Sequence, residues 1–224
     1  MKNINEVCVI IQARLGSQRV PQKMIKPFAQ TTLTDIALEK IKQCKAFPLK
    51  NFYLSAWESE LRNIAEKHNL NVFHRSEKSA KSEGTPMTEM YEWWDKLPFK
   101  YCVLINACAP FLNPETIDNF ITSYCKSDSD GMFGVVEKKN YFWDHNRDLL
   151  TPLTEAVMNT KTAKPMFEAA HCLYAGRMDK IGNEVWMGDF NTPGEIELFT
   201  MKEEEIFDID YEWQFNMAES LYGY

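Results

Sequence analysis

The sequence lacks the long apolar run that a membrane-spanning helix requires. No stretch approaches the roughly 18 consecutive apolar residues of such a helix. The early run VCVII at residues 7–11 follows Glu6 and is too short for the core of a signal peptide. We therefore expect a cytoplasmic protein that does not interact with a membrane.

Closely spaced cysteine pairs are also missing, because none of the six cysteines forms a C-x-x-C motif. This spacing argues against a zinc site. Most of the cysteines lie in apolar or helix-like segments, where a reduced cysteine behaves as a small hydrophobic residue. The pattern indicates buried thiols in a reducing compartment.

The chain has no excess of positive charge. Its 224 residues include 25 Lys and Arg against 32 Asp and Glu, giving a formal net charge of −7. Proteins that bind nucleic acid non-specifically usually carry a basic surface, so we expect no nucleic-acid partner. A hydrophobic content of 45% suits one globular domain spanning residues 1–224. Against this acidic background a basic cluster stands out, formed by Arg14, Arg19, Lys23 and Lys26.

The two common phosphate-binding loops are absent as well. The sequence contains neither G-x-x-x-x-G-K-[ST] nor G-x-G-x-x-G. We therefore expect neither a P-loop nucleotide hydrolase nor a dinucleotide-dependent dehydrogenase.

Short apolar runs alternate with amphipathic segments over the first 136 residues. The runs predict strands at 7–11, 51–56, 71–75, 101–107 and 131–136. The segments between them predict helices at 32–44, capped by Thr32 or Thr34, at 58–69, at 86–97 with Trp94 on the buried stripe, and from Pro114. This alternation is typical of a Rossmann-like α/β fold, with a mostly parallel sheet flanked by helices.

The pattern becomes aromatic and irregular between about 137 and 190. We expect an excursion from the sheet there, with strands near 140–144 and 171–175, which covers a site or contacts a partner chain. Strands are predicted again at 195–201 and 205–210, followed by a terminal helix at 211–222.

The basic cluster lies in the loop that follows the first predicted strand. Ligands of open parallel sheets bind at the carboxyl ends of strands. Gly16 and Ser17 allow backbone N–H groups to turn toward an anion, and Arg14 and Lys23 add charge-assisted contacts. From these residues alone, a solvated basic turn explains the loop as well as an anion site does.

The stretch IIQARLGSQRVPQK resembles the A-R-x-G-S-x-R-x-P-x-K signature of the sugar cytidylyltransferases. That family includes the acylneuraminate (CMP-sialic acid), legionaminate, pseudaminate and Kdo synthetases, in which this loop wraps the triphosphate of CTP. The resemblance implies charge stabilisation at the α-phosphate by Arg14 and Lys23. It also implies nucleotide binding by Ala13, Arg14, Gly16, Ser17, Arg19 and Lys23.

Three further stretches resemble the same family. FHRSEKSAKSEGTPMTEMYEW (73–93) implies that Arg75 lies near the nucleotide and Ser82 near its base or ribose. VLINACAPFLNPETID (103–118) places Asn106 where the sialic-acid enzymes have a glutamine that contacts the sugar. FDIDYEWQFNMAE (207–219) is similar to the closing D-I-D-x-x-x-D-F-x-x-A-E.

Two acidic residues near the carboxyl terminus form a candidate metal site. If residues 206–210 form a strand, Asp208 and Asp210 share one face and repel each other unless a cation lies between them. Mg²⁺ suits two carboxylates together with phosphate oxygens. An acidic strand end is the alternative from these residues alone, whereas the basic loop and the family pattern favour magnesium. Asp210 is also expected to be catalytic.

The carboxylate of a sugar acid would need a cationic partner. The excursion offers Arg147, Lys164, His171 and Arg177, and Tyr174 and Phe167 are candidates for lining the sugar pocket. Surface positions for the charges, and core positions for His171 and the aromatic residues, are the alternatives.

The family pattern is broken at several positions, including Met24, Ala109, Leu112 and the segment Glu212–Gln214, which lacks the usual aspartate before Phe215. These departures bear on the identity of the sugar more than on the CTP chemistry. The Kdo enzymes' G-D-E-P segment is missing, which disfavours Kdo.

The expected function is transfer of CMP from CTP to the anomeric hydroxyl of a nonulosonic, sialic-acid-like sugar acid. Pyrophosphate is released, Mg²⁺ is the cofactor, and the excursion forms a homodimer, as the resemblance implies. Two alternatives stay open. One is a nucleotidyltransferase of the same fold that uses Kdo or another nucleotide, and the other is a non-catalytic relative that binds a nucleotide or sugar.

Overall fold

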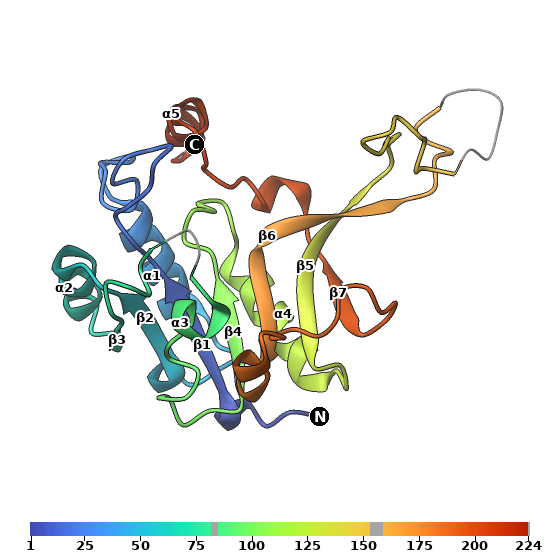
Figure 1. Ribbon diagram of the computed structural model, residues 1–224. Helices are drawn as coiled ribbons and strands as arrows, with labels where there is room; N and C mark the ends of the chain where they lie inside the picture. Colours follow the sequence, from blue (N-terminus) through green and yellow to red (C-terminus); the bar gives the residue numbers. More distant parts are fainter. Residues whose placement is uncertain (82–84, 153–158, 224) are drawn as a thin grey trace.

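The fold is built on one seven-stranded sheet (Figure 1), seen in a computed structural model that describes residues 1–81, 85–152 and 159–223. The strand order is β3-β2-β1-β4-β6-β5-β7. The strands are β1 (Val7–Gln12), β2 (Phe52–Ala56), β3 (Val72–His74), β4 (Tyr101–Ile105), β5 (Gly131–Lys138), β6 (Met166–Arg177) and β7 (Ile196–Thr200).

All neighbouring strands run parallel except at β6, which is antiparallel to both β4 and β5. The expected mostly parallel sheet is therefore confirmed. Strand β1 pairs with β2 on one side and β4 on the other, so the strand order reverses direction at β1. In open α/β sheets such a reversal leaves a crevice at the carboxyl ends of the strands, where ligands bind.

Helices flank the sheet (Figure 1) and begin where local chemistry caps them. Thr32 accepts a hydrogen bond from the Asp35 amide, and Asn113 accepts one from the Glu115 amide ahead of Pro114. The helices are α1 (Leu33–Gln43), α2 (Ser59–Lys67), α3 (Met87–Met90), α4 (Pro114–Lys126) and α5 (Glu212–Leu221). None of the helices in the described ranges is long and apolar enough to cross a membrane.

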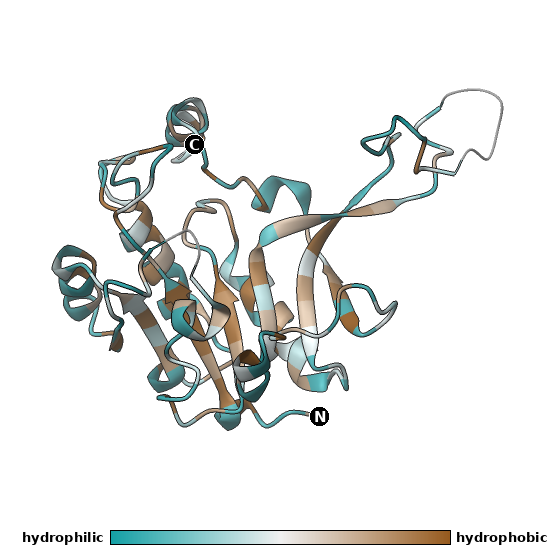
Figure 2. Ribbon diagram, viewed as in Figure 1, coloured by the Kyte–Doolittle hydropathy of each residue, from teal (hydrophilic) through white to brown (hydrophobic). Residues whose placement is uncertain are grey.

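Strand β1 is buried on both faces, which explains its uninterrupted apolar run. Val7, Val9 and Ile11 belong to a core cluster that includes residues of α1 and α4. Cys8 and Ile10 belong to a second cluster that contains Trp93, Met178, Ile181 and Trp186. Figure 2 shows this apolar character along the central strands. All six cysteines are unpaired thiols, three of them buried and three half-buried.

Three sequence predictions of secondary structure are wrong. The helix expected at 86–97 ends after one turn at Met90, because Trp93 turns inward, becomes fully buried and donates to Gln12, whereas Trp94 is only half-buried. Side-chain bonds and one isolated bridge replace the strand expected at 140–144. Residues 206–210 lie outside the sheet, since the amide of Ile209 donates to the carbonyl of Cys108.

The irregular region divides into two parts. Strands β5 and β6 continue beyond the sheet as a two-stranded ribbon that carries an arm, described at residues 139–152 and 159–165 (Figure 1). Their pairing reaches Lys138 opposite Met166 at the base of the arm. From Leu173 onward, β6 lies within the sheet between β4 and β5, so the carboxyl-terminal part of the expected excursion forms part of the body of the protein.

Candidate active site

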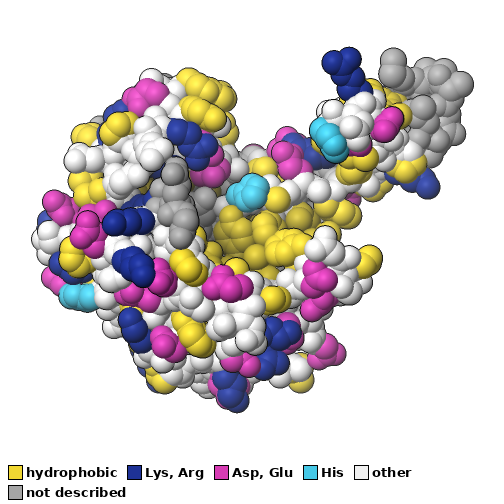
Figure 3. All heavy atoms as spheres, in the orientation of Figure 1, with side chains coloured by type: hydrophobic (Ala, Val, Ile, Leu, Met, Phe, Trp, Pro, Cys, Tyr) yellow, Lys and Arg dark blue, Asp and Glu magenta, His cyan; other side chains and the backbone are white. Residues whose placement is uncertain are grey.

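A cleft lies at the carboxyl ends of β1 and β4 and consists of two adjoining hollows that share Gln12, Arg14 and Asn106. The first hollow has a volume of about 440 Å³ and the second of about 510 Å³. Figure 3 shows hydrophobic side chains gathered on the same face of the protein, below the base of the arm. The reversal of strand order therefore produces a cleft where the sequence predicts a ligand.

The basic loop, residues 13–26, is held in place by its own apolar side chains. Val20 is completely buried and Met24 is 3% exposed, so both anchor the loop in the core. Arg14, Ser17, Arg19 and Lys23 line the second hollow together with Gln18 and Ala13. Gly16 has open space around the position of a Cβ atom. The loop is thus a fixed structure with three of its cations at a cavity.

The carboxyl-terminal acidic pair meets this loop. Arg19 Nη2 lies 2.5 Å from Asp210 Oδ1, although the two residues are 191 positions apart in the sequence. Lys23 Nζ lies 3.8 Å from the same oxygen and donates to the carbonyl of Ile209. The loop and the acidic pair therefore converge on one place.

Asp208 is the more deeply buried member of the pair. Its Oδ1 atom is buried and has no hydrogen-bond partner among the described residues. Burial raises the pKa of its carboxyl group, and repulsion from Asp210 raises it further. A buried carboxylate oxygen without a partner is costly, and a cation would relieve that cost.

The donor set limits which metal suits this pair. The described residues contain no group of three or more His, Cys, Asp or Glu side chains able to hold a metal. Two carboxylates are insufficient for a closed zinc site, but they fit Mg²⁺, which commonly takes one or two carboxylates and completes its shell with phosphate oxygens and water.

Arg75 lies at the junction of the loop and the first hollow. It is 3% exposed, and its guanidinium donates to the carbonyl of Ala13 at 2.6 Å and to that of Ser79 at 3.4 Å. Burial lowers its pKa to about 10, so it remains charged at neutral pH. Ser82, the other predicted contact from this segment, lies outside the described residues.

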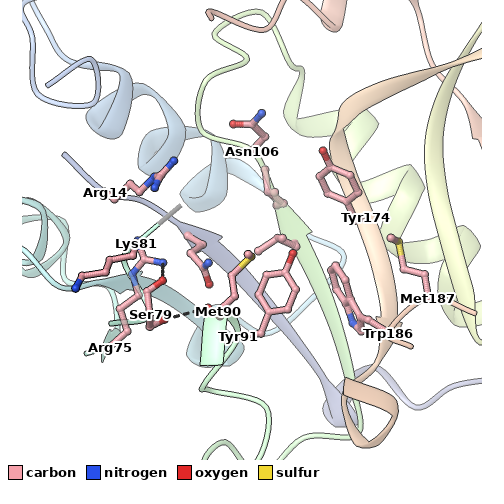
Figure 4. A pocket seen from close by; sticks show the side chains of 13 residues that line it. Arg14, Arg75, Ser79, Lys81, Met90, Tyr91, Asn106, Tyr174, Trp186 and Met187 are labelled. Carbon is pink, nitrogen blue, oxygen red and sulfur yellow. Dashed lines mark hydrogen bonds between the residues drawn. The ribbon is translucent and has the colours of Figure 1, made fainter. Parts of the chain in front are cut away.

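Three of the predicted sugar-side residues gather at the other end of the cleft. Asn106 donates to the carbonyl of His171 at 3.0 Å and accepts from the amide of Cys108. The hydroxyl of Tyr174 lies 3.5 Å from Nδ1 of His171. Tyr174 and Asn106 line the first hollow, opposite Arg14, Arg75 and Lys81 (Figure 4).

The remaining sugar-side candidates lie elsewhere. Arg147 lies in a turn of the arm, where its amide donates to the carbonyl of Asp144, and it lines neither hollow of its own chain. Arg177 pairs with Asp179 at 2.7 Å, and Phe167 borders a separate apolar groove. Lys164 is exposed and also lines neither hollow.

Several cleft residues escaped the sequence analysis. The wall opposite the basic side chains is formed by Tyr91, Trp186 and Met187. Trp186 and Met187 lie in a segment without periodicity, so no pattern predicted their position. Cys108 lines the second hollow, and burial raises its pKa to about 11, which keeps it a neutral thiol rather than a nucleophilic thiolate.

The departures from the family pattern fall mostly in the core. Ala109 and Leu112 are 3% and 2% exposed and line neither hollow, whereas Met24 reaches the second hollow. Gln214 takes over a capping role, because its Oε1 accepts from the amides of Asp210 and Tyr211 at 2.7 and 2.8 Å.

Comparison with known proteins identifies the class. A sequence model of the family described as "Cytidylyltransferase" matches residues 8–221. The chain belongs to the cytidylyltransferase family, and the resemblance seen in the basic loop is confirmed.

Individual relatives are more distant. The chain is 28% identical over 162 residues to the spore coat polysaccharide biosynthesis protein SpsF of Bacillus subtilis, covering 64% of each chain. It is 29% identical over 136 residues to the 3-deoxy-manno-octulosonate cytidylyltransferase of Rickettsia felis, covering 59% of this chain and 52% of that one. The chain thus aligns with between about half and two thirds of the length of these relatives.

Solved structures confirm the fold. A CMP:2-keto-3-deoxy-manno-octonic acid synthetase complexed with CTP matches with a TM-score of 0.68 at 12% identity, covering 96% of this chain and 98% of that one. A 4-diphosphocytidyl-2C-methyl-D-erythritol synthase from Anaerococcus prevotii matches with a TM-score of 0.65 at 12% identity, covering 96% and 95%.

Proposed function

We propose that this protein transfers CMP from CTP to the anomeric hydroxyl of a nonulosonic, sialic-acid-like sugar acid. The observation that carries the proposal is the convergence of the basic loop with Asp208 and Asp210 at one cleft of a cytidylyltransferase fold. Cations alone would suit any anion, and a carboxylate pair beside them suits a nucleotide that arrives with a divalent metal.

The reaction forms one bond and breaks another at the α-phosphorus. The anomeric oxygen of the sugar acid bonds to the α-phosphorus, the bond from that phosphorus to the bridging oxygen breaks, and pyrophosphate leaves. The hydroxyl proton passes to solvent. Positioning and charge neutralisation supply most of the catalysis in such transfers.

The basic loop takes the triphosphate in this proposal. Arg14 and Lys23 border the second hollow and neutralise the charge that develops as pyrophosphate leaves. Ala13 and Ser17 line the same hollow, and Gly16 belongs to the same phosphate assignment. Arg19 is bound to Asp210 in the free protein. On binding, a phosphate oxygen replaces Asp210 as its partner, which leaves Asp210 available to a metal.

Asp208 and Asp210 would hold Mg²⁺. A bound magnesium ion would neutralise phosphate charge and orient the reacting groups. The unpartnered buried oxygen of Asp208 and the proximity of Asp210 to Arg19 and Lys23 support this assignment.

The first hollow accommodates the base and the sugar acid. We assign the base to the side that carries Arg75, and Ser82 belongs to the same assignment. The sugar acid is assigned to the side formed by Asn106 and Tyr174, with His171 in contact with both residues. Arg147 can contact a sugar only in a partner's cleft, since it lies on the arm of its own chain.

A homodimer formed through the arm is part of the proposal. The arm exposes apolar side chains that monomeric proteins usually bury, including Trp143 at 56% and Leu150 at 51% exposure. Phe167 and Phe190 border an apolar groove of about 300 Å³ at the sheet surface. These surfaces suit an apolar interface.

Kdo is the alternative substrate. It is favoured by the relatives, since both the Rickettsia felis protein and the structural neighbour carry octulosonate names. The side of the first hollow formed by Tyr91, Trp186 and Met187 is apolar and aromatic. Such a surface suits an N-acyl or methyl substituent better than the hydroxyl-rich chain of Kdo, which favours the nonulosonic acid.

Pyrophosphate release tests the proposal directly. CTP, UTP, GTP and ATP are each supplied with Mg²⁺ and with N-acetylneuraminate, legionaminate, pseudaminate or Kdo. Turnover with CTP and a nonulosonic acid is expected, and turnover with Kdo alone would establish the alternative. Arg14→Ala should weaken CTP binding, whereas Arg62→Ala, which removes an arginine outside both hollows, should not.

Two results would contradict the proposal. A protein that CTP–Mg²⁺ stabilises against heat, but that turns over none of the sugar acids, would be a non-catalytic binder. A protein that binds no CTP at all would refute the assignment of the basic loop.

A further inference from the structure

Glu58 is a half-buried acid whose side chain contacts the basic loop but lines neither hollow. Its Oε1 accepts a hydrogen bond from the amide of Leu15 at 2.8 Å. Its Oε2 is buried and has no hydrogen-bond partner among the described residues. A carboxylate behind a loop that binds an anion opposes that binding by its charge, so its position calls for a different explanation.

Glu58 stands at a helix start but does not cap that helix. It is the N-cap residue of α2, where Ser, Thr, Asp or Asn would normally bond to the first helical amides. Its side chain makes no such capping bond. The carboxylate leaves its own helix uncapped and binds the loop instead.

Arg75 binds the same short stretch one peptide group earlier. Its Nη2 donates to the carbonyl of Ala13, while Glu58 accepts from the amide of Leu15. These two backbone groups belong to the two peptide planes on either side of Arg14. Because peptide groups are planar, a hydrogen bond to each plane constrains both backbone dihedral angles of Arg14 and so the direction of its Cα–Cβ bond.

We infer that Glu58 and Arg75 form a clamp that positions Arg14 for CTP, with Glu58 acting only as a positioning residue. The inference rests on the proposed function for its ligand, CTP. Burial lowers the pKa of Arg75, and the negative charge of Glu58 opposes that shift, so the two clamp residues attract each other. Each residue follows a strand next to or one removed from β1, so the sheet itself sets the spacing of the clamp.

The first test examines the clamp without any ligand. Amide hydrogen exchange of Leu15 in the free protein should be faster in Glu58→Ser than in the wild type, and close to wild type in Glu58→Gln, which keeps an acceptor oxygen. Serine also supplies the missing N-cap, so Glu58→Ser should leave α2 at least as stable. Unchanged exchange at Leu15 in Glu58→Ser would overturn the clamp, whatever the protein binds.

The second test measures CTP affinity by calorimetry. Glu58→Ser should bind CTP about tenfold more weakly, the loss expected when a hydrogen bond to a charged group disappears. Glu58→Gln should restore most of that affinity. Glu60→Ser, which removes an exposed acid two residues away, is the matched control and should bind like the wild type.

A double variant shows whether Glu58 acts through Arg14. If it does, Arg14→Ala combined with Glu58→Ser should bind CTP no more weakly than Arg14→Ala alone. Losses that simply add would refute the positioning role. A wild-type protein that binds no CTP while Leu15 behaves as expected would refute the proposed function and leave the clamp standing.

Discussion

Asp210 forms an ion pair with Arg19 in the free protein, with the two groups 2.5 Å apart and both partly exposed. Ion pairs in such surroundings contribute little to stability, because water and salt screen them. The pair therefore matters more for where the two side chains are held than for the folding of the chain. Substitutions of these two residues should therefore lower activity with little change in the free energy of unfolding.

Asp210→Asn should lower turnover by about a hundredfold or more, because it removes one of the two carboxylates assigned to the metal and a charge at the reacting phosphate. The free energy of unfolding should change by less than about 1 kcal/mol. Pyrophosphate release across a magnesium titration, with urea unfolding of the same sample, measures both. Near-normal turnover at low magnesium would remove the metal assignment.

Lys40 should make the stability of the folded protein depend on pH. Its ammonium is buried and donates to the carbonyls of Ala109 and Pro110, and burial lowers its pKa from 10.5 to about 7. Between pH 7 and 10.5 the unfolded chain therefore binds more protons than the folded chain, so this group makes stability increase with pH across that window.

From pH 7 to 8.5 this contribution should reach about 1.5 kcal/mol and should be absent from Lys40→Met. The comparison is confined to that range, because burial raises the pKa of thiols such as Cys108 and reverses the trend at higher pH. Urea unfolding of both proteins measures the difference. Parallel pH profiles would show that Lys40 does not titrate as described.

Helix α5 connects the carboxyl-terminal end of the chain to the site through its cap. Gln214 accepts from the amides of Asp210 and Tyr211, which fixes both the start of the helix and the backbone of Asp210. Gln214→Ala should lose about 1 kcal/mol of stability and part of the turnover, whereas Gln214→Glu keeps the acceptor and should retain both. Thermal unfolding and pyrophosphate release provide the measurements. Equal behaviour of the two variants would contradict this role of the cap.

The sequence predicts those elements whose structure depends on local pattern. The apolar run of β1, the Thr32 cap of α1 and the start of α4 at Pro114 all follow from neighbouring residues. The strand predicted at 205–210 fails because Ile209 bonds to Cys108, far away in the sequence, and not to a neighbouring strand. Contacts of that kind leave no periodic signal.

The candidate site shows the same difference between features set by local sequence and features set by long-range packing. The basic loop and the acidic pair are recognisable because their chemistry is concentrated in short stretches. The wall formed by Tyr91, Trp186 and Met187 depends on how an irregular segment packs against the sheet. The sequence pattern does not predict the role of Glu58 either, since an acid at the start of an amphipathic helix is common.

The whole molecule combines a compact body with a projecting arm, and the arm supports a prediction about assembly (Figure 1). Replacing Trp143 and Leu150 by serine should convert the proposed dimer into a monomer, because both side chains are more than half exposed in the single chain. Sedimentation at several concentrations measures the state. The matched double variant replaces Trp213 and Leu221 of α5, which are exposed outside the arm, and should leave the state unchanged.

A monomeric wild-type protein would contradict the proposed dimer. Loss of turnover in the arm variant at concentrations where it is monomeric would further indicate that the cleft depends on a second chain.

Strand β6 carries Met166 at the base of the arm and Tyr174 in the cleft, and between them its pairing with β5 shifts register, with His171 at a positive φ of 53°. An irregularity of this kind absorbs extra residues in one strand, whereas a residue inserted in the regular pairing between Leu173 and Arg177 would turn every later side chain to the opposite face. The break in register therefore lets the arm and the cleft change independently of each other.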